Sequence, residues 1–403
     1  MNKTIANTCC ALILPLVGGI SCAQSEFDSW QEALAAGGLT TAETYLADQR
    51  DTAETAFLLG SVRFLQAFET VFRQRYANFS GQLPIVPGMA AELPSNPDAE
   101  FDPMFFEMAL NDALNHLTEA ERALESATDG EFGVVVNLGD FWFDINADGA
   151  RDPWEGLTSI IGSMNPRRDF ESFDGLIRFD TADADWLAAY VHAVAGVLDF
   201  ALSLDPTPAI RTVYEGRTTI EQIAGIAQTP FIGDDDDALI DSIAAVLLTL
   251  EGVPDSTRTR AAHAHFKSMI AHNRSFWEKV GQETDDDREW LPNPGQTAAF
   301  GVPVDDTMAL AWQDVLDEID AILDGEQLIP YWRVRPRFNA ESPIGLNLRR
   351  LLQDPPDMNI ILWIQGAAAA PYLEEGSIAD MNAWRQFLRM TPGNSFLQAL
   401  WFN

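Results

Sequence analysis

The sequence is poor in thiols. Three cysteines occur in 403 residues, and all of them (Cys9, Cys10 and Cys22) lie at the N-terminal end. If processing removes that end, the remaining chain can form no disulfide and offers no thiol nucleophile or thiolate ligand. We therefore expect its rigidity to come from packing and from a bound ion.

Positive charge is also scarce. The chain has 25 Lys and Arg against 61 Asp and Glu, and its formal net charge is −36. A surface of this sign repels the phosphates of nucleic acids and anionic lipid head groups. We expect no nucleic-acid partner.

Several catalytic motifs are missing. We find no H-E-x-x-H, no G-x-S-x-G, no glycine-rich phosphate loop and no dinucleotide-binding fingerprint. Paired carboxylates of the glycosidase type remain open, because acids are abundant and their separation in space is not encoded locally. Of the five histidines, His263 and His265 lie two residues apart in a predicted helix and so on different faces. We interpret the other three as isolated packing or surface residues.

The first 23 residues have the pattern of a signal peptide. Lys3 is followed by an apolar stretch over 5–17 and by the small-residue segment Ser21-Cys22-Ala23. Cleavage after Ala23 predicts a periplasmic or secreted protein. The alternative is acylation of Cys22, which predicts an outer-envelope lipoprotein.

Helical periodicity dominates the rest of the chain. Apolar residues make up 47% of the sequence, which indicates a globular protein. The predicted helices cover 26–49 with a break at Gly37-Gly38, 53–79, 103–127, 154–164, 185–204, 209–228, 236–250, 256–281 and 305–324. The longest other apolar run, 360–370, is interrupted by Gln365 and Gly366, so we expect no transmembrane segment in the mature chain.

We therefore expect a mainly α fold, an irregular helical bundle or helical-repeat-like array with a few short strands. A strand at 176–179 is predicted to pair with 141–143, and 328–334 and 360–364 are β-leaning runs. Small and aromatic residues interleave on the long helices, which resembles tetratricopeptide-type helical pairs without their fixed period. The predicted domains are a helical one over 24–282 and a C-terminal extension over 283–403, either separate or continuous with it.

One stretch carries a specific chemical pattern. Residues 144–155 have the sequence DINADGARDPWE, in which oxygen-bearing side chains alternate with other residues around a glycine. This segment resembles the twelve-residue calcium loop of the EF-hand family, whose ligands occupy positions 1, 3, 5, 7, 9 and 12. The resemblance implies the ligands Asp144, Asn146, Asp148, the carbonyl of Ala150, Asp152 and Glu155.

The segment also departs from that family. Arg151 stands at position 8, where paired loops carry an apolar residue, and no second full loop exists in the chain. The preceding residues 133–143 favour a strand over an entering helix. We therefore expect a single structural Ca²⁺ clamp. The alternative is a plain turn, with Asp152 capping a helix that begins at Pro153.

Two weaker clusters are further candidates. Asp180, Asp183 and Asp185 could hold a second cation or could cap a helix. A second cluster, Arg333, Arg335 and Arg337, could bind an anion or could pair with acids of this chain. Seven tryptophans could line a sugar- or peptide-binding groove, although core packing is the simpler explanation: Trp142, Trp154, Trp277, Trp290, Trp312, Trp332 and Trp363.

From these features we expect a calcium-binding, non-catalytic binding or scaffold module of the cell envelope, with a protein, small-molecule or glycan ligand. One alternative is a secreted hydrolase of extracellular polymers that uses paired carboxylates and structural calcium. The other is the lipoprotein anchored at Cys22.

Overall fold

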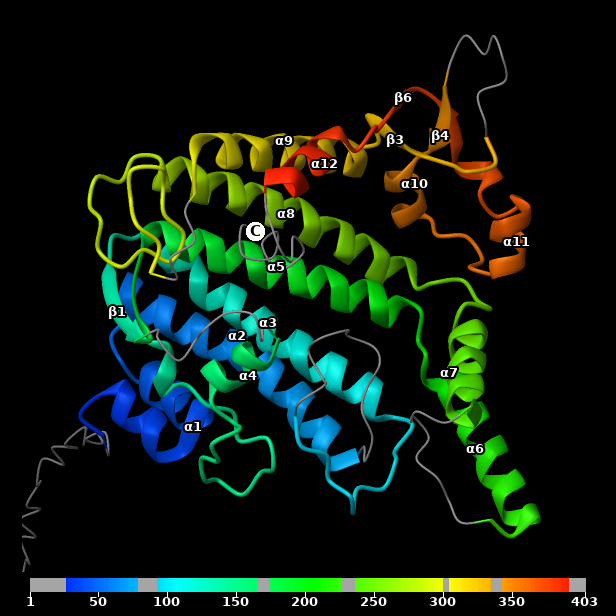
Figure 1. Cartoon of the computed structure of the whole chain (residues 1–403), viewed down its shortest axis with the longest axis horizontal. Coiled ribbons are helices and arrows are strands. Elements are labelled where there is room, and N and C mark those ends of the chain that lie inside the picture. Colours follow the sequence, from blue (N-terminus) through cyan, green and yellow to red (C-terminus); the bar gives the residue numbers. More distant parts are fainter. Residues whose placement is uncertain are drawn as a thin grey trace, which may run out of the picture.

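The computed structural model describes residues 27–78, 93–164, 174–226, 236–299, 304–334 and 343–390. Twelve α-helices dominate these residues and the strands are short, so the predicted mainly α fold is confirmed (Figure 1). The N-terminal segment with Cys22, and also Arg335 and Arg337, lie outside the described residues.

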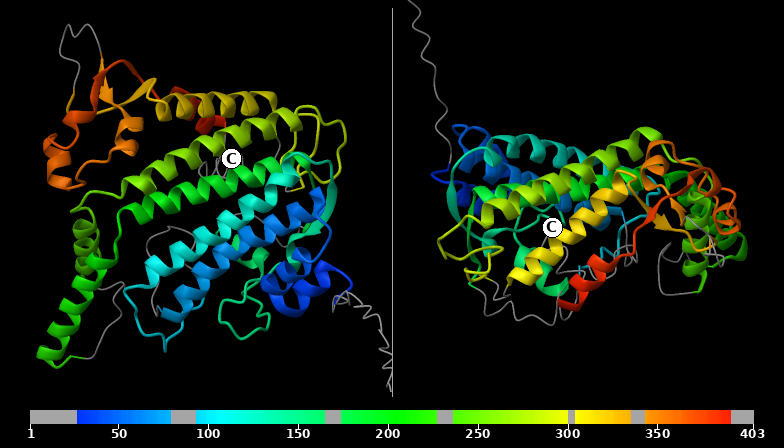
Figure 2. Two further views of the ribbon diagram at one scale, coloured as in Figure 1. Left: turned by 180° about the vertical axis from the view of Figure 1, so that it is seen from behind. Right: turned by 90° about the horizontal axis from the view of Figure 1, so that it is seen from above.

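Five long helices lie side by side in one layer (Figures 1 and 2). In spatial order they are α2 (Ala53–Asn78), α3 (Phe105–Thr128), α5 (Thr181–Ser203), α8 (Ser256–Val280) and α9 (Asp306–Leu323). Successive helices of the layer run antiparallel. At one end, Gly130 packs against Ala53 and its carbonyl accepts a hydrogen bond from Thr181 Oγ1 (2.9 Å), which brings the end of α3 to the starts of α2 and α5.

Helix α1 (Trp30–Ala47) packs across α2. Gly37 and Gly38 have non-helical backbone angles, as the predicted break requires. Gly38 has a φ of 67°, and a Cβ there would lie 3.4 Å from the ring of Trp142. A larger residue would therefore meet both backbone strain and the indole that packs against this bend.

A small antiparallel ribbon follows α3. Strand β1 (Gly133–Asn137) pairs with β2 (Leu176–Asp180), which then leads into α5. The prediction that residues 176–179 pair with 141–143 is wrong. The turn η1 (Leu138–Asp140) redirects the chain before Phe141, and Trp142 instead forms a bridge with Gly156, just ahead of α4 (Leu157–Met164).

An arm projects from one end of the layer (Figure 2, left). It consists of α6 (Thr207–Ala224) and α7 (Asp236–Thr249). Arg217 of α6 joins them through its ion pair with Asp241 of α7 (2.8 Å), and it also pairs with Glu221 on its own helix (3.1 Å). A small apolar cluster of Phe105, Ile210 and Ala245 fixes its base to α3.

The C-terminal part adds a small sheet with the strand order β5-β4-β3-β6. Its strands are β3 (Gln327–Pro330), β4 (Ile344–Leu346), β5 (Leu373–Glu375) and β6 (Ser377–Ile378), and its helices are α10 (Leu348–Gln353), α11 (Ile360–Gln365) and α12 (Asn382–Met390). The β-leaning prediction for 360–364 is wrong. Asn359 Oδ1 accepts hydrogen bonds from the N–H groups of Ile361 (3.0 Å) and Leu362 (3.2 Å), so this apolar run begins as a capped helix.

The main apolar cores cross the expected domain boundary. One core cluster joins Ile270 and Phe276 of α8 to Trp312 and Leu316 of α9 and to Phe387 of α12. Residues on both sides of position 283 therefore share a core.

Helix α5 bears on the expectation that no segment of the mature chain crosses a membrane. Among the described residues it is the one helix that is long and apolar enough to do so. It nevertheless lies between α3 and α8, and it carries the buried polar residues Asp185, His192 and Asp199. These contacts are those of a core helix.

Candidate functional site

The predicted calcium loop is a series of side chains that bond to the backbone of the loop itself. Asp144 Oδ1 accepts from the N–H of Gly149 (3.2 Å), Asn146 Oδ1 from Asp148 (3.0 Å), and Asp148 Oδ1 from Ala150 (2.8 Å). Each bond fixes the position of one side-chain oxygen relative to the loop backbone. Gly149 has a φ of 74°, the left-handed conformation that favours glycine at the sharp turn.

Three of the predicted ligands meet on one side of the loop. Asn146 Nδ2 donates to Asp148 Oδ2 (3.1 Å) and to Asp152 Oδ2 (3.2 Å), so both carboxylates face the same amide. The donor set around this point is made of oxygen-bearing side chains, which suits a hard cation such as Ca²⁺. Ala150 lies at the exposed tip of the loop.

Glu155 closes the loop from the buried side. Its side chain is fully buried, Oε1 accepts from the N–H of Ile145 (2.8 Å), and Oε2 accepts from that of Asp152 (2.9 Å). The carboxylate therefore ties both ends of the loop together. The capping alternative expected a helix from Pro153, but α4 begins at Leu157.

Helix α2 holds the first residue of the loop through two side chains that sequence reasoning missed. Glu69 Oε1 accepts from the N–H of Asp144 (2.8 Å), and Arg73 Nε donates to the carbonyl of Asp144 (3.0 Å). Burial raises the pKa of Glu69, and the Asp144 N–H acts in the opposite direction. The only local signal was a Glu and an Arg four residues apart on this helix.

The predicted cluster Asp180, Asp183 and Asp185 has two separate structural roles, a helix cap and an ion pair. Asp180 and Asp183 form a capping box at the start of α5, as the helix-cap interpretation predicts. Asp185 points instead toward α8, where it bonds to His272 Nδ1 (2.8 Å), Ser275 Oγ (2.9 Å) and Lys279 Nζ (2.5 Å). The three aspartates therefore do not share one site.

Carboxylates near the start of α5 have raised pKa values. Burial, and next the neighbouring Asp180, raises the pKa of Asp183 well above its usual value. The same two causes raise the pKa of Glu283 to about 7. Burial likewise raises the pKa of Glu289. This corner of the molecule therefore holds carboxyl groups that resist ionisation.

Of the predicted anion-binding cluster Arg333, Arg335 and Arg337, the structure describes only Arg333. Arg333 lies in an exposed turn after β3 and not on a strand, and its guanidinium bonds to the backbone carbonyls of Ile364 (3.2 Å) and Gln365 at the end of α11. It therefore pairs with a helix C-terminus, and not with the acidic side chains that the simpler interpretation assigned to it.

The tryptophans divide between core and surface. The indole N–H groups of buried Trp142 and Trp312 donate to Leu34 O (3.0 Å) and Asn273 Oδ1 (2.9 Å), whereas Trp332 is 61% exposed.

The interpretation of His192 and His272 as isolated residues is wrong. Both belong to a row of polar side chains between α5 and α8, in which each helix contributes residues at intervals of seven. We call this row the histidine ladder. It consists of Asp185, His192 and Asp199 on α5 and Arg258, His265, His272 and Lys279 on α8.

His192 stands at the centre of the histidine ladder. Its Nδ1 lies 2.9 Å from Nδ1 of His265, and its ring stacks on that of His272 with centroids 5.4 Å apart. Each histidine that α8 contributes to the histidine ladder faces an aspartate of α5. His272 bonds to Asp185, as already described, and His265 Nε2 lies 3.8 Å from Asp199. Asp199 in turn pairs with Arg258 (2.9 Å).

One depression of about 520 Å³ opens beside this row. Its lining includes Glu131 of the loop after α3 together with Asp185, His272, Ser275 and Lys279. Asp185 is held by three partners there, and its bonds from His272, Lys279 and Ser275 lower its pKa even though burial acts to raise it. The carboxylate is thus a stable anion that positions the groups around it.

No protein-family model matches the chain, and no curated protein sequence or solved structure is significantly similar to it.

Proposed function

We propose that this protein is an exported helical binding module that is stabilised by one calcium ion in the loop 144–155. The observation that carries the calcium assignment is the set of three successive side-chain-to-backbone bonds that orient Asp144, Asn146 and Asp148. The EF-hand-like spacing of the oxygen-bearing residues supports the calcium assignment, and the layer of antiparallel helices suits a binding module.

Calcium would act here as a structural clamp. The loop connects β1 to α4, and it is tied to α2 through Glu69 and Arg73. An ion held by Asp144, Asn146, Asp148, Asp152, Glu155 and the Ala150 carbonyl would link these elements without any disulfide. Because such an ion binds the folded chain in preference to the unfolded one, it raises the free energy of unfolding.

A thermal unfolding experiment tests the clamp. The melting temperature of chelator-treated protein is expected to rise on addition of Ca²⁺, and Asp148→Ala is expected to abolish the rise. Asp148 is exposed, so its loss should leave the ion-free protein folded. Asp98→Ala, at an exposed loop aspartate elsewhere, is the matched control. An equal Ca²⁺-induced rise in wild type and Asp148→Ala would contradict the assignment.

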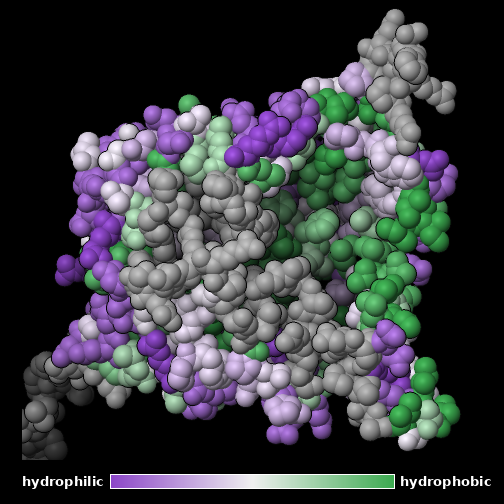
Figure 3. Space-filling model, in the orientation of Figure 1, coloured by the Kyte–Doolittle hydropathy of each residue, from purple (hydrophilic) through white to green (hydrophobic). Residues whose placement is uncertain are grey.

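The binding role rests on an exposed apolar surface along α6, α7 and α11, which we call the apolar edge (Figure 3). On α7 its members recur at helical spacing. The exposed residues are Ile220 and Ile223 near the end of α6 and Ile226 just after it, Leu239, Ile240, Ile243, Val246 and Leu247 on α7, and Ile360, Ile361, Leu362 and Ile364 on α11. Contiguous exposed apolar surface of this kind marks interaction sites.

The charge of the chain indicates the occupant of the apolar edge. Asp236 and Asp237 lie exposed at the start of α7, and the whole chain has a net charge of −36. A second copy would bring like charges together, whereas a basic amphipathic helix would match both the apolar stripe and the acidic surroundings. We infer that the partner presents such a helix.

A model peptide tests this inference. A Leu/Lys amphipathic helical peptide is expected to bind the wild-type protein at least tenfold more tightly than Ile243→Ser/Val246→Ser, measured by fluorescence anisotropy. Leu310→Ser, at an exposed apolar residue of α9, is the matched control. Equal affinity of all three proteins would contradict the proposal, and so would sedimentation showing that the apolar edge is covered by self-association.

Export is the remaining part of the proposal, based on residues 1–23. Mass spectrometry of the mature protein from its native host should find an N-terminus at Gln24. An acylated Cys22 would replace the soluble form with the lipoprotein, and an intact Met1 would contradict export.

A further inference from the structure

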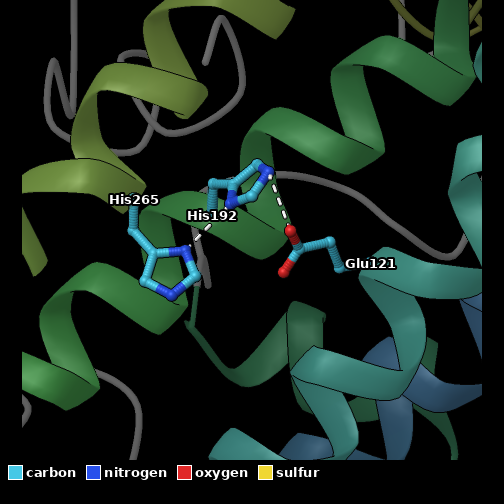
Figure 4. Close-up of side chains that lie close together, drawn as sticks. All are labelled: Glu121, His192 and His265. Atoms are coloured by element: carbon cyan, nitrogen blue, oxygen red, sulfur yellow. Dashed lines mark hydrogen bonds and ion pairs between the residues drawn. The ribbon is translucent and has the colours of Figure 1, made fainter. Parts of the chain in front are cut away.

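We propose that Glu121, His192 and His265 bind a divalent transition metal ion of the Zn²⁺ class where α3, α5 and α8 meet. The three side chains come from three different helices and point toward one another (Figure 4). This site is separate from the calcium loop, and its ligand atoms are of a different chemical kind.

The separations of the ligand atoms fit one ion. One ligand atom from each of the three side chains lies within 4.8 Å of the other two. Ligands to zinc lie roughly 2.0–2.2 Å from the metal, so two of them are at most about 4.4 Å apart. Small side-chain rotations of Glu121 and His265, which are both partly exposed, would close the remaining gap.

The ligand types select the metal. Two imidazoles and one carboxylate suit zinc and neighbouring first-row metals better than the hard cations Ca²⁺ and Mg²⁺, which prefer oxygen ligands alone. Three protein ligands also leave a coordination position for water or another small ligand. Glu121 provides the solvent side, since its side chain is 40% exposed while that of His192 is 7% exposed.

The two histidines bring potential ligand atoms together. His192 Nδ1 lies 2.9 Å from Nδ1 of His265. Each of these ring nitrogens can bind a metal ion when it carries no proton, so the pair offers two imidazole ligands at one place.

The outer part of the histidine ladder would orient the ligands. His265 Nε2 faces Asp199, and Arg258 holds that carboxylate with a bond of 2.9 Å. Carboxylates behind metal-bound histidines fix the ring and increase its basicity. On the opposite side the ring of His272, which Asp185 holds, stacks on His192 and restricts its rotation.

Cobalt titration tests the site in the full chain. Protein stripped of transition metals and kept in saturating Ca²⁺ is titrated with Co²⁺, whose visible absorption strengthens when the ion is held in a four- or five-coordinate site. Zn²⁺ is then used in competition. We expect one site per chain. Glu121→Gln and His265→Gln should each weaken binding about 100-fold or more, because each removes a ligand directly.

Two variants serve as controls. Glu125→Gln removes an exposed carboxylate one turn further along α3, and Asp148→Ala disables the calcium loop. Both should bind Co²⁺ like the wild type. The proposal is overturned if no absorption band develops, or if folded Glu121→Gln and His265→Gln, checked by circular dichroism, bind as tightly as Glu125→Gln. Loss of the band in Asp148→Ala alone would place the ion in the calcium loop and would equally overturn it.

Discussion

At the scale of single residues, the carboxyl groups near the start of α5 make the stability of the protein depend on pH. Glu283 is half-buried and lies near Asp180 and Glu289, and its pKa is about 7 in the folded protein against 4.5 for an ordinary glutamate. Between these values the folded chain holds a proton that the unfolded chain has released. Stability therefore falls as the pH rises through this window.

Glu283→Gln should remove this penalty. We expect the variant to be more stable than the wild type by about 1–2 kcal/mol at pH 8, a value reduced from the full pKa difference because the group is partly solvated. At pH 4 the two proteins should be equally stable. Urea unfolding at both pH values is the measurement, with the exposed Glu278→Gln as control. A gain that is equal at pH 4 and pH 8 would contradict the assigned cause.

Contacts between residues that are close in the sequence could be predicted from it. The alternation of Asp144, Asn146 and Asp148 around Gly149 sets the loop bonds through near neighbours in the chain. The contact between His192 and His265 could not be predicted in the same way. The residues are 73 positions apart, and their contact depends on the register of α5 against α8. Glu69 was missed for the same reason.

At the scale of elements, close helix packing depends on small residues. Gly60 of α2 faces α3, and a Cβ at this position would lie 2.6 Å from Cγ of Leu124, which is 1% exposed. Because Leu124 is enclosed, it cannot turn away into solvent. The two helices can approach this closely only with glycine at position 60.

Gly60→Ala should therefore destabilise the protein by about 1–2 kcal/mol, since the overpacking strain exceeds the gain in helix propensity. Gly216→Ala in α6 is the matched control, because nothing lies within 4 Å of a Cβ there. We expect that control to stabilise by about 0.5–1 kcal/mol. Urea unfolding measures both, and a stabilised Gly60→Ala would show that the helices do not pack as described.

The start of a helix could be predicted where the capping residue and the helical spacing of apolar residues indicate the same position. Asp255 accepts from the N–H of Thr257 and begins α8 at Ser256, as predicted. The run 360–364 was misassigned because its β-branched and aromatic residues favour a strand while the cap at Asn359 favours a helix. Over six residues the cap and the left-handed Gly366 prevail.

At the scale of the whole molecule, the sequence predicted helices but not their order in space. The layer α2–α3–α5–α8–α9 arises because each antiparallel neighbour buries the apolar side of the previous helix. The position of the α6–α7 arm, and with it the apolar edge, depends on that order. Periodicity marks a residue such as Ile240 as apolar but does not show that it remains 61% exposed.

An ion in the loop 144–155 would join β1, α4 and α2 in a molecule whose three cysteines all lie in the first 22 residues. Isothermal titration of Ca²⁺ into the chelator-treated chain measures this directly. We expect a saturable binding heat with one ion per chain that disappears in Asp148→Ala and persists in Asp98→Ala. The absence of any binding heat in the folded wild-type protein would contradict the calcium assignment.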